Sequence, residues 1–218
     1  MSRLLLFDID GTLVDTGGAG MAALKQAATE MFGAEGPELD LAGSTDSGIV
    51  NGILEYFGSD ASHEVFYQAY LSQLGTQLGI FSGRVLPGVV ELLTELAGDA
   101  AAFGLLTGNI AAGAEAKLVH YELNQFFPIG AFGDDHHDRN KLGPVALNRA
   151  QEHYQKAFSA SEAVIIGDTP KDVACGKAIG AQTLGVATGS FSVDQLADCG
   201  ADLVVQDLMD PVAREFLA

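Results

Sequence analysis

The sequence predicts an α/β fold, a doubly wound parallel sheet with a helical segment inserted into it. Two observations support this prediction. Short apolar runs of strand length alternate with longer segments of helical periodicity, a pattern typical of parallel sheets with crossover helices. The alternation is interrupted between residues 17 and 85, where helical patterns predominate. Hydrophobic residues make up 48% of the 218 residues and charged residues 18%, so the whole chain is expected to fold.

Six apolar runs are interpreted as strands, because near-continuous apolar sequence is typical of strands buried on both faces. They are Leu4–Phe7, Ala102–Leu106, Ile129–Phe132, Ala163–Ile166, Thr183–Val186 and Leu203–Val205. All are far shorter than the roughly 20 apolar residues that a membrane-spanning helix needs. No membrane partner is therefore expected.

Helices are expected between these strands, and turn or capping residues precede them. Pro170 suits a first helical position, because proline has helix-like φ and lacks the N–H that would go unpaired there. The expected helices are Val89–Leu96, Ala111–Glu122, Val145–Tyr154 and Pro170–Ile179.

The interruption is interpreted as a helical cap over residues 17–85, and residues 1–16 and 86–218 as the core that carries the sheet. Helical periodicity within the cap covers Met21–Phe32, Ser47–Phe57 and His63–Leu78. Gly17, Gly18 and Gly83 are candidate hinges, although ordinary loop glycines fit the same positions.

Charge and cysteine content exclude some classes of partner. The net charge is −18 and only eleven residues are Lys or Arg, whereas binding a nucleic-acid backbone requires clustered cations. Cys175 and Cys199 have no metal-ligand spacing, and no signal peptide is recognisable, so a cytoplasmic location is expected. The sequence indicates no oligomeric state.

Two aspartates follow the first apolar run, in FDIDGTLVD at residues 7–15. Strand side chains repeat every second residue, so Asp8 and Asp10 are expected to project to the same side. Two carboxylates there repel each other unless a cation lies between them or one is protonated. Their expected tasks are those of a nucleophile and an acid/base.

A second polar group follows the run that ends at Leu106. The Thr107 hydroxyl and the backbone N–H groups of Gly108 and Asn109 suit phosphate oxygens. Taken alone, the segment could be a strand-to-helix turn in which Asn109 caps the helix.

A cation is needed near the aspartates, and DRNKLGP at residues 138–144 offers two. We prefer Lys141 and keep Arg139 as the alternative. The neighbouring acids and histidines at residues 134–138 are interpreted as a hydrated loop, because consecutive residues do not easily converge on one ion.

A fourth group follows the strand that ends at Ile166, in GDTPKD at residues 167–172. Asp168 can complete an oxygen-rich Mg²⁺ site, and Asp172, about one helical turn further on, can support it. In open α/β sheets ligands bind at the carboxyl ends of the strands, where all four groups are expected to meet.

These residues resemble the haloacid dehalogenase-like superfamily, in the order of its four motifs and across essentially the whole chain. The resemblance implies a Rossmann-like core, an aspartyl-phosphate intermediate and Mg²⁺. By similarity, the nucleophile is Asp8, the general acid/base Asp10, the phosphate-binding hydroxyl Thr107, the cation Lys141, and the metal-binding acids Asp168 and Asp172, with Asp8 and Asp10 beside them. Many members read Lys-Pro-x-Pro where this chain reads Lys141-Leu142-Gly143-Pro144, which keeps Arg139 in contention.

The insertion also resembles the small helical caps of this superfamily, and Gly43-Ser44-Thr45-Asp46 looks like the cap loop that faces the catalytic site. Thr45 and Asp46 are therefore candidate substrate contacts, beside Gly108, Asn109 and Arg139. The phosphoglycolate phosphatase-like branch is the nearest likeness, which implies Mg²⁺-dependent hydrolysis of a small phosphorylated metabolite. The alternatives are a phosphomutase of the beta-phosphoglucomutase type and a non-catalytic protein that binds a phosphorylated ligand.

Overall fold

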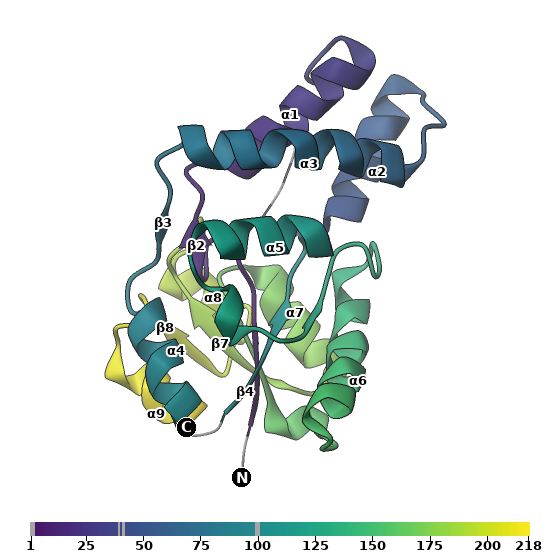
Figure 1. The fold of residues 1–218 in the computed structure, drawn as a ribbon. Helices are drawn as coiled ribbons and strands as arrows, with labels where there is room; N and C mark the ends of the chain where they lie inside the picture. Colours follow the sequence, from purple (N-terminus) through teal and green to yellow (C-terminus); the bar gives the residue numbers. More distant parts are fainter. Residues whose placement is uncertain (1–2, 39, 41, 99–100) are drawn as a thin grey trace.

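The computed structural model describes residues 3–38, 40, 42–98 and 101–218 (Figure 1). Its main sheet has six parallel strands in the order β5-β4-β1-β6-β7-β8. The strands are β1 (Leu4–Phe7), β4 (Ala102–Leu106), β5 (Gly130–Ala131), β6 (Ala163–Gly167), β7 (Gln182–Val186) and β8 (Leu203–Val205). The predicted α/β fold with a doubly wound parallel sheet is thereby confirmed.

Strand β5 is shorter than the predicted run Ile129–Phe132. It lies at the edge of the sheet, and Pro128 before it has no N–H to donate. At its other end the N–H of Phe132 donates to the carboxylate of Asp135, 2.9 Å away, so this residue turns away from the ladder.

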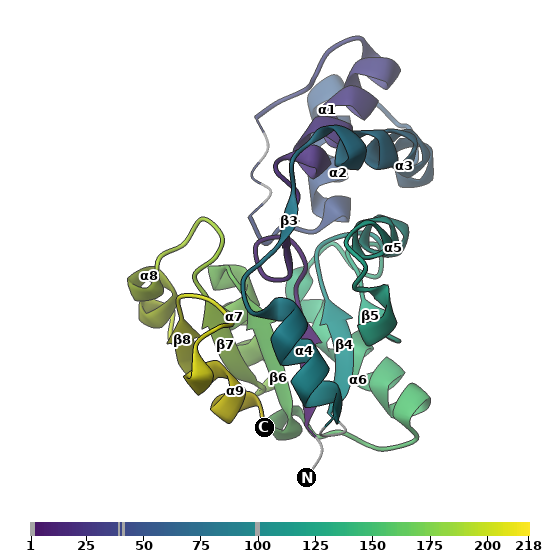
Figure 2. The same ribbon diagram turned by 60° about the vertical axis from the view of Figure 1, so that its left-hand side comes forward.

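Helices cover both faces of the sheet. Leu5 and Phe7 of β1 pack in an apolar cluster with helices on one face, and Leu4 and Leu6 pack on the other, as the two-residue period of a strand requires. The first face is covered by α4 (Val89–Gly98), α5 (Ala111–His120) and α9 (Pro211–Leu217), and the second by α6 (Leu142–Tyr154) and α7 (Pro170–Ile179). Figure 2 shows α4 and α9 in front of the sheet, and the short helix α8 (Val193–Asp198) beside β7 and β8.

Three further helices lie beyond the carboxyl ends of the strands (Figures 1 and 2). They are α1 (Ala19–Phe32), α2 (Asp46–Phe57) and α3 (His63–Ile80), and together we call them the three-helix segment. They share their own apolar cluster, to which the core contributes Ile110 at the start of α5. The division at residues 17 and 85 into cap and core stays a prediction.

The three-helix segment is joined to the sheet by a two-stranded antiparallel ribbon. Strand β2 (Val14–Asp15) pairs with β3 (Arg84–Val85), and Val14 lies opposite Val85. The chain therefore leaves the core and returns to it at one place. Among the described residues, no helix is both long and apolar enough to cross a lipid bilayer.

Candidate active site

The ends of three neighbouring strands bring the predicted residues together. Phe7 of β1 is in register with Leu105 of β4 and with Ile166 of β6. Asp8, Thr107 and Asp168 follow these strands, and the Asp8 N–H still continues the ladder to the Ile166 carbonyl at 2.9 Å. The site therefore lies at the carboxyl edge of the sheet, where ligands bind in open α/β folds.

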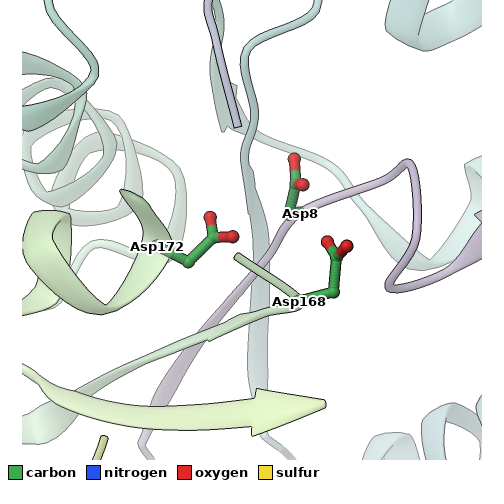
Figure 3. A group of neighbouring side chains, drawn as sticks. All are labelled: Asp8, Asp168 and Asp172. Carbon is green, nitrogen blue, oxygen red and sulfur yellow. The ribbon is translucent and has the colours of Figure 1, made fainter. Parts of the chain in front are cut away.

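Three buried carboxylates form the centre of this site. Asp8, Asp168 and Asp172 each offer an oxygen, and these oxygens lie within 4.8 Å of one another. Figure 3 shows the three side chains as neighbours, with Asp172 coming from helix α7. Gly11 and Gly189 pack against Asp168 so closely that a Cβ at either position would collide with its carboxylate.

Burial and mutual repulsion make these carboxylates hard to ionise. Burial, together with the charges of Asp8 and Asp172, raises the pKa of Asp168 to about 8. Burial also raises the pKa of Asp8 to about 6, although the Arg139 guanidinium opposes the shift. A cluster of hard oxygen donors with excess negative charge fits a divalent cation such as Mg²⁺.

Arg139, not Lys141, is the cation beside Asp8. Its Nη2 lies 3.2 Å from Asp8 Oδ1, forms an ion pair with Asp172 and donates to the Leu106 carbonyl at 3.2 Å. The prediction that Lys141 lies beside Asp8 was wrong, because Lys141 is exposed and does not line the cavity that contains Asp8. Both residues lie on one 3₁₀ turn, Arg139–Lys141, and residues two apart on such a turn point in different directions.

Asp10 was predicted to be a metal ligand beside Asp8, but its carboxylate lies outside the three-carboxylate cluster. It is bound by a buried lysine instead. Lys117 Nζ, on helix α5, lies 2.8 and 2.6 Å from the two oxygens of Asp10 and 2.6 Å from Asn109 Oδ1. Asn109 Nδ2 in turn donates to Asp10 Oδ2 at 2.8 Å. The sequence interpretation missed Lys117, although its spacing from Ala114 places it on the buried face of the helix.

The Thr107 segment is brought to the site as predicted. The Thr107 hydroxyl is buried and accepts hydrogen bonds from the Asn109 N–H at 3.3 Å and from Asn109 Nδ2 at 2.9 Å. Gly108 has no room for a side chain, because a Cβ there would collide with the carbonyl of Ser44. Thr107 itself does not line the cavity, whereas Gly108 and Asn109 do.

Of the two residues predicted from the 43–46 loop, Asp46 lines the cavity and Thr45 does not. The Thr45 hydroxyl donates to the His137 carbonyl at 2.7 Å and accepts from the Gly48 N–H at 3.2 Å, so it caps α2 instead. The Asp46 carboxylate accepts from the Ile110 N–H at 2.9 Å, and burial raises the pKa of Asp46 to about 6. This loop therefore fastens the three-helix segment to the sheet.

The cavity above the carboxylates has a volume of about 430 Å³, within the range of small-molecule sites. Core residues, among them Asp8 and Asp168, form its floor, and the three-helix segment supplies Met21, Leu24 and Tyr70. It contains a carboxylate nucleophile candidate, a second carboxylate held by a lysine, and a buried arginine. This set can carry out covalent and acid/base chemistry on an anionic group.

Comparisons with known proteins show the family to which the chain is similar. The model of the family described as haloacid dehalogenase-like hydrolase matches residues 5–186. A phosphoglycolate phosphatase of Vibrio parahaemolyticus is 25% identical over 221 residues, covering 95% of this chain and 93% of that protein. A probable phosphatase, IndB, of Dickeya dadantii is 26% identical over 224 residues, covering 97% and 93%.

Solved structures share the fold. CbbY of Rhodobacter sphaeroides, in complex with phosphate, superposes with a TM-score of 0.76 at 18% identity and covers 96% of both chains. A hydrolase of Pseudomonas syringae gives a TM-score of 0.71 at 21% identity and covers 98% of this chain and 97% of that one. At these identities the likeness concerns the arrangement of the chain alone.

Proposed function

The chain belongs to the haloacid dehalogenase-like hydrolase family, and on that premise we propose that it is a phosphatase that hydrolyses a small phosphate monoester through an aspartyl-phosphate intermediate. The observation that carries the proposal is the position of Asp8. Its carboxylate lies at the floor of the cavity, 3.2 Å from the Arg139 guanidinium and beside Asp168 and Asp172. The relatives named phosphoglycolate phosphatase support the class of reaction.

In the first step an Asp8 oxygen attacks phosphorus. The bond between phosphorus and the ester oxygen breaks, its electron pair stays on the alcohol oxygen, and Asp10 supplies the proton. Arg139, the Thr107 hydroxyl and the backbone N–H groups that follow it offset charge on the phosphoryl oxygens.

In the second step Asp10, now ionised, removes a proton from water, whose oxygen attacks the phosphorus of the aspartyl phosphate. The bond from phosphorus to Asp8 breaks and inorganic phosphate leaves. Lys117 and Asn109 hold the ionised Asp10 carboxylate by the contacts described above, which suits its task as a base.

A magnesium ion fits the oxygens of Asp8, Asp168 and Asp172. When bound, it neutralises charge on the phosphoryl group and on the carboxylates that hold it. The Thr169 N–H and hydroxyl donate to Asp172 at 3.0 and 2.7 Å, which orients that carboxylate.

We assign the three-helix segment the role of a cap, in line with the predicted boundary at residues 17–85. Closing it over the cavity would exclude bulk water from the reacting groups. Two free cysteines, Cys175 and Cys199, fit the reducing cytoplasm as the place of action.

The experiment that tests the proposal measures phosphate release from p-nitrophenyl phosphate in the presence of Mg²⁺. Turnover that disappears in Asp8→Asn, with the fold unchanged by circular dichroism, is the expected result. Binding of the ester without any phosphate release would show a protein that binds phosphorylated ligands instead. Transfer of the phosphoryl group to a sugar rather than to water would show a phosphomutase.

A further inference from the structure

We infer that the alcohol released by this enzyme carries no second anionic group, so that its substrates are phosphate monoesters of uncharged or amine-bearing alcohols with an aliphatic part. This inference rests on the proposed phosphatase function and refines it. It follows from where the cavity places its charges and its apolar surface.

Among the described residues, the cations that line the cavity are Lys117 and Arg139, which come from the core and are each paired with a carboxylate. The ammonium group of Lys117 has three donors, and three oxygens lie within 2.8 Å of it, two from Asp10 and one from Asn109. Arg139 pairs with Asp8 and with Asp172. Arg139 Nε has no hydrogen-bond partner among the described residues, and the pairing of Nη2 with Asp8 places this guanidinium at the phosphoryl end of the cavity.

The roof of the cavity, which the three-helix segment forms, is largely apolar. Met21 and Leu24 of α1, Ile49 of α2 and Tyr70 of α3 line it, and the last three are buried. Such a surface favours the aliphatic parts of a ligand, because burying them removes apolar area from water.

The one ionisable acid that α2 contributes to the roof adds negative charge. Asp46 lies at the start of α2 and faces the cavity, with the Ile110 N–H as its hydrogen-bond donor. A carboxylate or second phosphate on the alcohol would have to approach Asp46 at low dielectric, where like charges repel strongly. An amine would be attracted there.

The other basic residues near the roof do not line the cavity. Among the described residues that line the cavity, those of the three-helix segment include no Lys, Arg or His. Lys25 pairs with Glu35 at 3.1 Å, and Arg84, 71% exposed in its side chain, pairs with Asp15 at 3.5 Å. Lys171 donates to the hydroxyl of Ser44 at 2.7 Å and does not line the cavity.

The electropositive features next to the roof are the amino terminus of α1 and the Lys117 ammonium, whose Nζ would lie 3.5 Å from a Cβ on Gly20. Helix α1 begins after Gly18, which offers no side-chain cap, and its dipole corresponds to about half a positive charge. Asp10 offsets the charge of Lys117, which leaves the full negative charge of Asp46 larger than the charge of the helix dipole. We therefore expect the enzyme to discriminate against substrates whose alcohol part is anionic.

The test compares esters that differ only in a CH₂OH group replaced by a carboxylate, at about pH 7.5 with Mg²⁺. The pairs are 2-hydroxyethyl phosphate with phosphoglycolate, and glycerol 3-phosphate with 3-phosphoglycerate, with phosphoethanolamine as the cationic member. We expect kcat/KM to be at least about tenfold higher for the uncharged member of each pair, and for phosphoethanolamine than for phosphoglycolate. Where neither member is turned over, their competition with p-nitrophenyl phosphate gives the same ranking.

A charge placed in the roof provides the matched control. Met21→Lys, inside the cavity, should raise kcat/KM for phosphoglycolate relative to 2-hydroxyethyl phosphate by about tenfold. Ala22→Lys adds the same charge to the same helix at a residue that does not line the cavity, and should leave the ratio unchanged.

Equal or better use of the carboxylate esters by the wild type would overturn the inference and leave the phosphatase function standing. Failure to hydrolyse any ester, p-nitrophenyl phosphate included, would overturn the proposed function and this inference with it.

Discussion

Lys117 Nζ lies 2.6 Å from Asp10 Oδ2 and 2.8 Å from Asp10 Oδ1, so one buried ammonium binds both oxygens of a carboxylate at the cavity. The lysine side chain is 4% exposed and that of Asp10 41%. The cation is therefore fixed by the fold, and the carboxylate is held by it at the edge of the site. Asp10 thus has a position of its own, separate from the cluster around Asp8.

Lys117→Met should lower kcat about 10- to 100-fold, because Asp10 would lose the contact that orients it for proton transfer. The loss should be larger for alkyl phosphates, which need protonation of the departing oxygen, than for p-nitrophenyl phosphate. Measuring kcat across a series of leaving groups checks this. Lys141→Met, which removes an exposed lysine, is the control, and a uniform loss across the series would contradict a role through Asp10.

Arg139→Ala should reduce kcat about 100- to 1,000-fold, the usual cost of removing one electrostatic donor from an active site. Lys141→Ala should leave kcat close to that of the wild type. Because Arg139→Ala leaves Asp8 and Asp172 buried without their cation, it should also destabilise the fold by about 3–5 kcal/mol. Activity is therefore compared per folded molecule, with Arg139→Lys as a second variant that retains the charge, and a crippled Lys141→Ala would reverse the assignment.

Asp8→Asn should abolish steady-state turnover while the protein stays folded, since the amide has the size of the carboxylate and lacks its nucleophilic oxygen. Phosphate release and circular dichroism on a preparation checked by mass spectrometry for deamidation measure both effects. Turnover at the wild-type rate would rule out Asp8 as the nucleophile.

Mg²⁺ should raise the melting temperature of the protein, because an ion that binds only the folded state stabilises it. Asp168→Asn should abolish this shift, since Asp168 belongs to the three-carboxylate cluster. Ca²⁺, which prefers more ligands at longer distances, should bind and inhibit turnover. Full activity after exhaustive chelation would contradict the metal site.

Asp46→Asn should change how stability depends on pH. Burial raises the pKa of Asp46 from 3.8 to about 6 in the folded state, so the folded state binds this proton more tightly than the unfolded state does. The resulting stabilisation is complete below the unfolded pKa and is lost as the pH rises through about 6. The unfolding free energy of Asp46→Asn, relative to the wild type, should therefore increase by about 2 kcal/mol between about pH 4.5 and 7.5. Urea unfolding of both proteins at the two pH values measures it, and parallel curves would show that Asp46 is not buried as described.

Most of the sheet was predictable because buried parallel strands are continuous apolar runs in the sequence. Asp8, Thr107 and Asp168 each follow one of these runs, so they were expected to meet at the carboxyl ends of the strands. The strand at Ile129–Phe132 was predicted too long, since the sequence does not show that Asp135 takes the Phe132 N–H. Edge strands have fewer partners, and local hydrogen bonds end them.

The cations were harder to predict, because their assignment depends on the direction of single side chains. A spacing rule favoured Lys141, yet the 3₁₀ turn directs Arg139 inward. Lys117 lies in the middle of a helix, and only the count of helical turns from Ala114 shows that it is buried. The pairing of Lys117 with Asp10, 107 residues apart, depends on how α5 packs beside β1, which the local sequence does not contain.

The antiparallel ribbon formed by β2 and β3 has an evolutionary consequence. Because Val14 and Val85 lie opposite each other, the segment between them is an insertion that leaves the sheet domain and returns to it at a single place. The order and pairing of the six main strands do not depend on this insertion. It can therefore be lengthened, shortened or replaced without changing them. Selection can thus remodel the roof of the cavity in one stretch of the gene while the three clustered aspartates, encoded outside it, stay where they are.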